Sequence, residues 1–289
     1  MQVFSFNLPI LRRALAGLTA LLTLLIARFY PEPPPEYYPD TGVTSFVLVD
    51  ALVRAQGITT DGENLYFGWN FGLTKTDLTG RYALRIRLLP LALLRKGVDH
   101  IGGVSYYDGK IYCAMEDSGV FENLYIGVYD AKTLKMIGYK AVPLENHEFG
   151  IPWVAVDRNT GLLYSARRDH FEVLNIYDAE SLELVDTLAL NAPVHKIQGG
   201  EVHGGVLYVA DSREGQAVFA INLVTGQVQK LFSRFVPGGK GQGLTILPAD
   251  ASSGGSGAFF YILDEDTPHL SIHMRAYAFD PASLAWYTP

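Results

Sequence analysis

The sequence predicts an all-β fold of five similar units, because one short pattern recurs five times. Each unit contains an apolar segment built on a tyrosine, namely Tyr66, Tyr112, Tyr164, Tyr208 and Tyr261. Consecutive tyrosines are 44 to 53 residues apart, and an aspartate or asparagine followed by a turn comes after each one. A period of this size, made of short strands and turns, is typical of a β-propeller with one four-stranded antiparallel blade per repeat.

The second repeat shows how each blade divides into strands. We expect an inner strand over 102–107, which the hairpin signal Asp108-Gly109 joins to a second strand over 110–115. The third strand is expected over 124–130 and the outer strand over 134–142. The other repeats have turn signals at matching places, and the fifth carries an insertion, Asp250 to Gly257, that predicts a surface loop.

The ring is expected to close through an N-terminal outer strand. The stretch Ser45 to Val53 precedes the first inner strand, Gln56 to Thr60, and has no repeat of its own. Pairing it with the blade of Tyr261 would remove two open sheet edges. Six blades with one degenerate unit is the alternative, although the sequence shows no sixth tyrosine unit.

Residues that recur once per repeat are expected to serve the fold. An aspartate or asparagine at a strand end caps the following turn through hydrogen bonds to the backbone. We expect this role for Asp77, Asp130, Asp178, Asn222 and Asp280. The repeated tyrosines are expected to pack between blades.

The N-terminal residues are predicted to lie outside the propeller. Arg12-Arg13 precedes an uncharged apolar run from Ala14 to Ala27, followed by a proline-rich stretch. This order predicts a signal peptide or an uncleaved signal-anchor over 1–28, a linker over 29–42 and the propeller domain over 43–289. The protein is then secreted, or extracytoplasmic and anchored by its apolar segment. A buried N-terminal helix is the alternative.

Composition limits the partners and the chemistry. The net charge is −7 and no basic stripe or Lys/Arg cluster stands out, which argues against a nucleic-acid partner. Cys113 is the only cysteine, so an intramolecular disulfide is excluded, and its apolar strand predicts a buried, unreactive thiol. We expect a monomer whose membrane contact, if any, runs through the uncleaved N-terminal segment.

Ligands of propellers bind where inner strands begin and second strands end, at one mouth of the central channel. Polar and aromatic residues that break the repeat at these places are the candidates. The predicted catalytic residues are His100 and Glu116, and the predicted ligand-binding residues are Gln56, Trp69, His147, Trp153, Arg168, His195, Asp211, Gln242 and Asp264.

His100 and Glu116 are the best acid–base pair, since both lie in repeat two, where successive strands are neighbours. The structural alternative for Glu116 is a salt bridge to Arg167 or Arg168 of the next blade. A divalent metal in the channel stays open as a cofactor. His100, His147 and His195 with a carboxylate would suit zinc, but they stand at unequal distances from their inner strands. Carboxylates such as Asp264 would suit calcium.

The stretch 43–289 resembles the broad group of NHL-type and quinoprotein-amine-dehydrogenase-like propellers. The tyrosine strands and the segments 126–130 (IGVYD) and 174–178 (LNIYD) carry this resemblance. It implies the fold and no particular activity.

The chain is also similar to plant-type glutaminyl-peptide cyclotransferases in its length, signal segment and five repeats. Gln56-Gly57-Ile58 and Gln242-Gly243-Leu244 resemble the Gln-Gly-Leu motif of that family's inner strands. The Phe-Thr that precedes the motif is Arg54-Ala55 in one copy and Lys240-Gly241 in the other. For this reason no catalytic residue is transferred from the family.

Two function classes follow. The first is an extracytoplasmic module that binds a small polar ligand, a sugar or a peptide at the channel mouth. The second is a channel-mouth enzyme, either a cyclotransferase or a hydrolase such as a lactonase, with or without a metal. A histidine and a carboxylate within hydrogen-bond reach would favour the enzyme.

Overall fold

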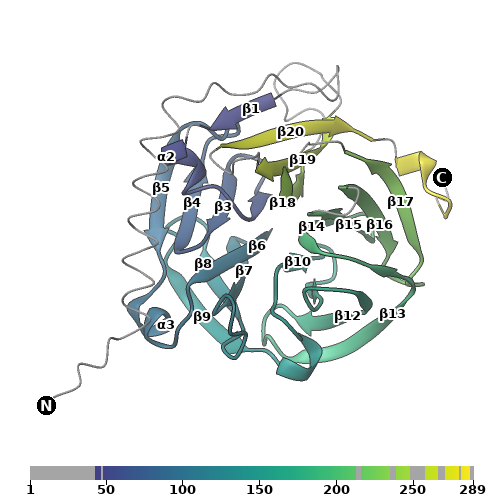
Figure 1. Ribbon diagram of the computed structural model, residues 1–289, viewed down its shortest axis with the longest axis horizontal. Coiled ribbons are helices and arrows are strands. Elements are labelled where there is room, and N and C mark those ends of the chain that lie inside the picture. Colours follow the sequence, from purple (N-terminus) through teal and green to yellow (C-terminus); the bar gives the residue numbers. More distant parts are fainter. Residues whose placement is uncertain are drawn as a thin grey trace, which may run out of the picture.

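The computed structural model describes residues 43–46, 48–212, 216–234, 239–247, 258–265, 271–279 and 281–286. These residues form five four-stranded antiparallel sheets that surround a common axis as the blades of a propeller (Figure 1). The predicted fold class is therefore confirmed. The predicted signal segment, the linker, the loop from Asp250 to Gly257 and the turn residue Asp280 lie outside the described residues.

Each blade runs from an inner strand at the axis to an outer strand at the rim. Blade 1 contains β2 (Ile58–Thr60), β3 (Leu65–Trp69), β4 (Gly72–Thr76) and β5 (Ala83–Leu88). Blade 2 contains β6 (His100–Tyr107), β7 (Lys110–Glu116), β8 (Tyr125–Asp130) and β9 (Met136–Ala141). Blade 3 contains β10 (Ala155–Val156), β11 (Leu162–Ser165), β12 (Phe171–Asp178) and β13 (Leu184–Val194).

Blade 4 contains β14 (Ile197–His203), β15 (Val206–Asp211), β16 (Ala217–Asn222) and β17 (Val228–Ser233). Blade 5 contains β18 (Lys240–Ile246), β19 (Ala258–Glu265), β20 (Ile272–Ala278) and, as its outer strand, β1 (Val43–Phe46). Among the described residues, four short helical segments lie between or after the strands: α2 (Leu48–Ala51), α3 (Leu91–Arg95) and the 3-10 turns η1 (Leu144–Asn146) and η2 (Pro281–Ser283).

The N-terminal end of the domain closes the ring in the predicted blade, but over fewer residues than predicted. β1 pairs antiparallel with β20, from Val43 opposite Arg275 to Phe46 opposite Ile272. The stretch from Ser45 to Val53 is thus wrong as a single strand, because Leu48–Ala51 forms α2. The reason is the length of the partner strand: β20 begins at Ile272, so no strand residue of β20 lies opposite the residues after Phe46.

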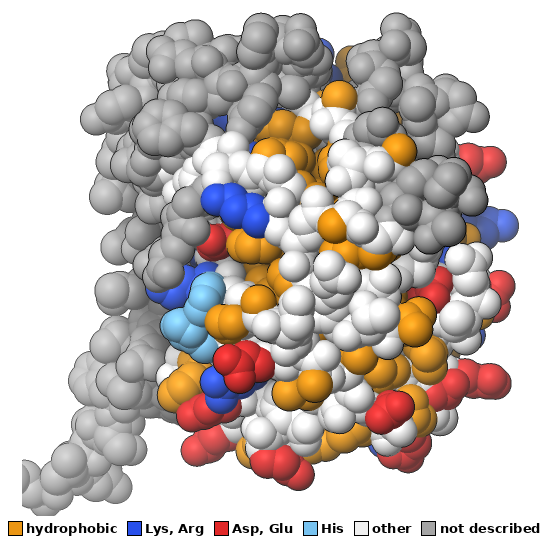
Figure 2. All heavy atoms as spheres, turned by 90° about the vertical axis from the view of Figure 1, so that its right-hand side faces the viewer, with side chains coloured by type: hydrophobic (Ala, Val, Ile, Leu, Met, Phe, Trp, Pro, Cys, Tyr) orange, Lys and Arg blue, Asp and Glu red, His pale blue; other side chains and the backbone are white. Residues whose placement is uncertain are grey.

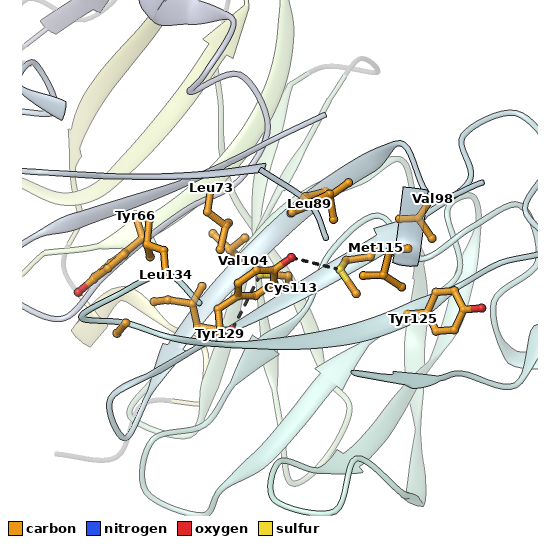
Figure 3. Packing of buried hydrophobic residues seen from close by; sticks show 14 residues of the cluster. Tyr66, Leu73, Leu89, Val98, Val104, Cys113, Met115, Tyr125, Tyr129 and Leu134 are labelled. Carbon is orange, nitrogen blue, oxygen red and sulfur yellow. Dashed lines mark hydrogen bonds between the residues drawn. The ribbon is translucent and has the colours of Figure 1, made fainter. Parts of the chain in front are cut away.

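Apolar clusters between neighbouring blades form the core, and the repeated tyrosines belong to them. Tyr66, Tyr112 and Tyr208 are each 1% exposed. Figure 3 shows the cluster between blades 1 and 2, where Tyr66 and Leu73 belong to one blade and Cys113 to the other. Cys113 is fully buried, as predicted, and burial raises the pKa of its thiol.

The recurring aspartates cap turns, as predicted for the described ones. Asp130 Oδ1 accepts hydrogen bonds from the backbone N–H and the hydroxyl of Thr133, at 2.7 and 2.5 Å. Asp178 accepts the same pair from Ser181, at 2.7 and 2.8 Å. These side chains stabilise the link between third and outer strands, so they are committed to the fold.

Candidate ligand site at one end of the channel

The inner strands approach one another so closely at one level that only glycine fits. A Cβ on Gly57 would lie 2.5 Å from the carbonyl oxygen of Gly102, and one on Gly243 would lie 2.5 Å from the backbone nitrogen of Ile58. Gln56 and Gln242 directly precede these glycines. The glycines therefore bring two predicted ligand-binding residues of neighbouring blades to one level of the channel.

His100 and Glu116 are direct cross-strand partners, since one begins β6 and the other ends β7. His100 Nδ1 lies 3.2 Å from Glu116 Oε1, a close contact that is not well aligned as a hydrogen bond. The guanidinium of Arg168 forms an ion pair with the same oxygen. The predicted pair of His100 with Glu116 and the alternative, a salt bridge from Glu116 to Arg168, are thus both present on one carboxylate.

The second oxygen of Glu116 is also engaged. The backbone N–H of Ile151 donates a hydrogen bond to Oε2 over 3.0 Å. A Cβ on Gly150 would lie 2.4 Å from the same oxygen, so the chain of blade 3 passes directly over the carboxylate. Glu116 is fully buried as a result, and its side chain is held from blades 2 and 3 at once.

The charge state of Glu116 follows from these contacts. Burial alone would raise the pKa of its carboxyl group, but the contact with His100 and the charge of Arg168 outweigh burial, so the pKa lies below its ordinary value. An ionised carboxylate beside Nδ1 favours the tautomer of His100 that carries its proton there. No hydrogen bond joins Nε2 of His100 to another described residue, so this nitrogen can accept one from a ligand.

Several polar atoms of the predicted site residues are buried without a hydrogen-bond partner among the described residues. They include Gln242 Oε1, His195 Nδ1 and Trp153 Nε1, although the Trp153 ring itself is 0% exposed and belongs to the apolar cluster between blades 3 and 4. Gln242 is fully buried and its Nε2 donates a hydrogen bond to Glu265 Oε2 over 3.0 Å. Its Oε1 therefore remains available to accept a hydrogen bond. Buried polar groups of this kind are normally satisfied by protein, water or ligand.

Two histidine rings meet at the surface near this end. His195 is half-buried and lies edge-on to the exposed His170, with ring centroids 3.9 Å apart. Figure 2 shows histidine side chains exposed at one edge of its view, with Lys or Arg and acidic side chains close by.

Asp211 and Asp264 belong to a second, fully buried cluster around two arginines that the sequence did not single out. Asp264 forms ion pairs with Arg234 and, over 3.2 Å, with Arg275. The backbone oxygen of Asp211 accepts a hydrogen bond from Arg234 over 3.0 Å. Asp264 is 0% exposed, and Arg234 and Arg275 are 2% and 4% exposed. The cluster holds blades 4 and 5 together, which gives Asp264 a structural partner set.

His147 does not present its ring to solvent. It is 1% exposed, and its Nε2 lies 2.8 Å from the hydroxyl of Tyr177 and 3.4 Å from that of Ser165. Burial lowers the pKa of His147 to about 4, so the ring is neutral at neutral pH. Of the remaining predicted residues, Gln56 donates to Asn70 over 3.5 Å and Trp69 is 8% exposed.

One buried carboxylate in the channel has no signal in the sequence. Glu201 of β14 is 2% exposed and accepts hydrogen bonds from Thr59 of β2 and Thr245 of β18, over 3.0 and 3.1 Å. Arg158 donates to its other oxygen over 3.3 Å. Burial raises the pKa of Glu201 against the opposing effect of Arg158. This network ties the inner strands of blades 1, 4 and 5 across the axis.

No group of three or more His, Cys, Asp or Glu side chains lies close enough to hold a metal ion in the part of the chain that the structure describes. Likewise, within the described ranges no helix is long and apolar enough to cross a membrane.

No protein-family model matches the sequence, and no curated relative was found. Among solved structures, the chain is similar to the glutaminyl cyclase of Myxococcus xanthus, with a TM-score of 0.58 and 12% sequence identity over 83% of this chain and 97% of that chain. At 12% identity this similarity shows the fold alone. It confirms that the chain resembles a glutaminyl cyclase in its fold. The WD40 repeats of RRP9 are less similar, with a TM-score of 0.46 and 12% identity over 77% of this chain and 61% of that chain.

Proposed function

We propose that the protein binds a small polar ligand, such as a sugar or a peptide, at this end of its channel. The observation that carries the proposal is that predicted site residues of blades 3 and 5 each have a buried polar atom, Trp153 Nε1 and Gln242 Oε1, with no hydrogen-bond partner among the described residues. One is a donor and the other an acceptor, so a ligand that both accepts and donates hydrogen bonds would satisfy them.

The charged groups nearby favour a ligand with an anionic or hydroxyl group. Arg168 is paired with Glu116, yet its side chain keeps 23% of its surface exposed. Nε2 of His100 is able to accept a hydrogen bond in the favoured tautomer.

Tryptophan fluorescence tests the proposal without a label. The chain has three tryptophans, and two of them, Trp69 and Trp153, are candidate site residues. In a Trp286→Phe variant, all tryptophan emission comes from Trp69 and Trp153. We expect glucose or a glutaminyl dipeptide to change the emission in a saturable way, and His100→Ala to weaken the response. His203→Ala, which removes an exposed histidine at the far end of β14, is the matched control and should leave the response unchanged.

The alternative function, a channel-mouth enzyme, is favoured by one specific observation. The 3.2 Å contact between His100 and Glu116 gives a histidine with a carboxylate at Nδ1, the arrangement of a general base acting through Nε2. A solved propeller with the same overall fold is a glutaminyl cyclase. Release of ammonia from a glutaminyl dipeptide is therefore the reaction to assay. Activity that His100→Ala abolishes would support the enzyme, whereas binding without turnover would support the binding module.

We further propose that the domain works outside the cytoplasm, either secreted or held by its N-terminal segment. The support is the charge and hydropathy order of residues 1–28. Cell fractionation of the full chain, followed by N-terminal sequencing, tests the location and the cleavage. Recovery of the intact chain in the soluble cytoplasmic fraction would contradict both forms of this proposal.

A further inference from the structure

The outer strand of blade 1 exposes more large apolar side chains than the outer strands of blades 2, 3 and 4, β9, β13 and β17. Alternate residues of a strand share one face, so Leu84, Ile86 and Leu88 of β5 lie together. Their exposed fractions are 58%, 47% and 63%, and Tyr82 and Leu91 beside them are 70% and 60% exposed. These five residues form the blade-1 rim.

The outer strands of blades 2, 3 and 4 lack such a surface. β9 exposes Ile137 and Tyr139, at 59% and 39%, and β13 exposes Val185, at 53%. No large apolar residue of β17 is among the exposed ones in the described part of the chain. An apolar face on an edge strand favours association, so its concentration on one blade points to a partner.

The charge around the blade-1 rim indicates the kind of partner. Residues 81–96 contain five Lys or Arg residues and no Asp or Glu, in a chain whose net charge is −7. Other residues, mostly apolar, separate Arg81, Arg85, Arg87 and Arg95, so the five do not form a continuous basic run in the sequence. Four of them are exposed, namely Arg81, Arg85, Arg95 and Lys96.

We propose that the blade-1 rim docks on the surface of an anionic lipid bilayer. Apolar side chains that enter the interface, flanked by cations that face anionic headgroups, are the features that such a surface binds. The proposal goes beyond ligand binding at the channel and does not depend on it.

The position of β1, where the described part of the chain begins, supports the same partner. The described chain begins at Val43 in β1, and Figure 1 places β1 and β5 in neighbouring positions along the rim of the ring. The segment expected to enter the membrane ends near residue 28, so 29–42 is its connection to the domain. A connection of this length spans at most about 50 Å, which keeps blades 5 and 1 close to the bilayer.

A cysteine scan with an environment-sensitive dye tests the docking on the full chain. Cys113 is fully buried, so a cysteine introduced at an exposed position is the site that reacts. The test variants are Ile86→Cys and Leu88→Cys, and the control is Ile137→Cys, whose side chain is similarly exposed on β9. Each labelled protein is mixed with vesicles of phosphatidylcholine alone, or of equal parts phosphatidylcholine and phosphatidylglycerol.

We expect the dye at 86 or 88 to shift to shorter wavelengths on the anionic vesicles only, and the dye at 137 to stay unchanged. Arg85→Gln combined with Arg95→Gln should raise the lipid concentration needed for half of the shift about 30-fold, since each basic residue near the surface contributes about fivefold. An equal shift at 137, or no shift at 86 and 88, would overturn the proposal. Two further results would also overturn it. If the dye at 86 or 88 is already shielded before lipid is added, the N-terminal segment covers the rim. If its emission depends on the protein concentration, the rim mediates self-association.

Discussion

Glu116 is the residue on which the candidate site depends most, because the guanidinium of Arg168, the imidazole of His100 and the backbone N–H of Ile151 converge on its carboxylate. Breaking a buried ion pair by removing one partner leaves the others without their counter-charge. We therefore expect Glu116→Gln to lower the free energy of unfolding by about 3 kcal/mol in urea denaturation. This figure is reduced if the partly exposed Arg168 turns towards water.

Glu183→Gln is the matched control for that change. Glu183 also pairs with a cation, Lys140, but both side chains are exposed, at 64% and 37%. Exposed pairs contribute less than about 1 kcal/mol, so the control should be nearly neutral. Equal losses in the two variants would show that Glu116 does not carry the buried network.

His147 makes stability depend on pH. Its pKa is about 4 in the folded protein and 6.5 as the reference value, so between these values the unfolded chain binds the proton first. The stabilisation by the neutral buried ring is complete above pH 6.5 and is lost as the pH falls towards 4. The free energy of unfolding in urea should fall between pH 7 and pH 4.5, and this fall should be about 2 to 3 kcal/mol smaller in His147→Gln than in the parent. Identical losses in both proteins would mean that another group controls the dependence.

At the scale of residues, the sequence predicted pairs that lie on adjacent strands and missed pairs that lie between blades. His100 and Glu116 could be paired because both belong to one repeat. Arg234 could not be paired with Asp264, since it follows an outer strand and meets a second strand of the next blade. His147 was expected at the mouth, but the 3-10 turn before it leads its ring towards Tyr177.

At the scale of elements, β1 is the strand whose role is easiest to test. It is the only described strand of blade 5 that comes from the N-terminal end of the chain. We expect the full chain and the chain 43–289 both to unfold cooperatively. A chain 48–289, which lacks β1 and leaves β20 as an open edge, should melt several degrees lower.

Thermal unfolding followed by circular dichroism distinguishes the two truncations. If 43–289 loses its cooperative transition, the preceding residues belong to the core. If 48–289 melts with 43–289, β1 does not close the ring in a way that matters for stability.

Most elements could be predicted from the repeat, with errors at their ends. The inner strand of blade 2 begins at His100, two residues before the predicted start, because His100 pairs with Glu116. The inner strand of blade 1 begins at Ile58, although Gln56 was expected in it. Strand ends depend on the partner strand, and the partner's length is not written in the segment itself.

At the scale of the whole molecule, the five tyrosine units were sufficient to predict five blades. The contacts that cross the axis were not predictable, because Glu201, Thr59 and Thr245 carry no common spacing and come from blades 4, 1 and 5. The glycines that let the inner strands meet were visible in the sequence, but only the structure shows that each faces the backbone of the next blade.

The proposed ligand site lies at the end of the channel that holds Gln242. A crystal structure of the full chain, grown with the probe that changes tryptophan emission, is the decisive test of this site. We expect density for the probe within hydrogen-bond distance of both Trp153 Nε1 and Gln242 Oε1. Density for the probe elsewhere, with these two atoms bonded to protein groups instead, would contradict the proposed binding.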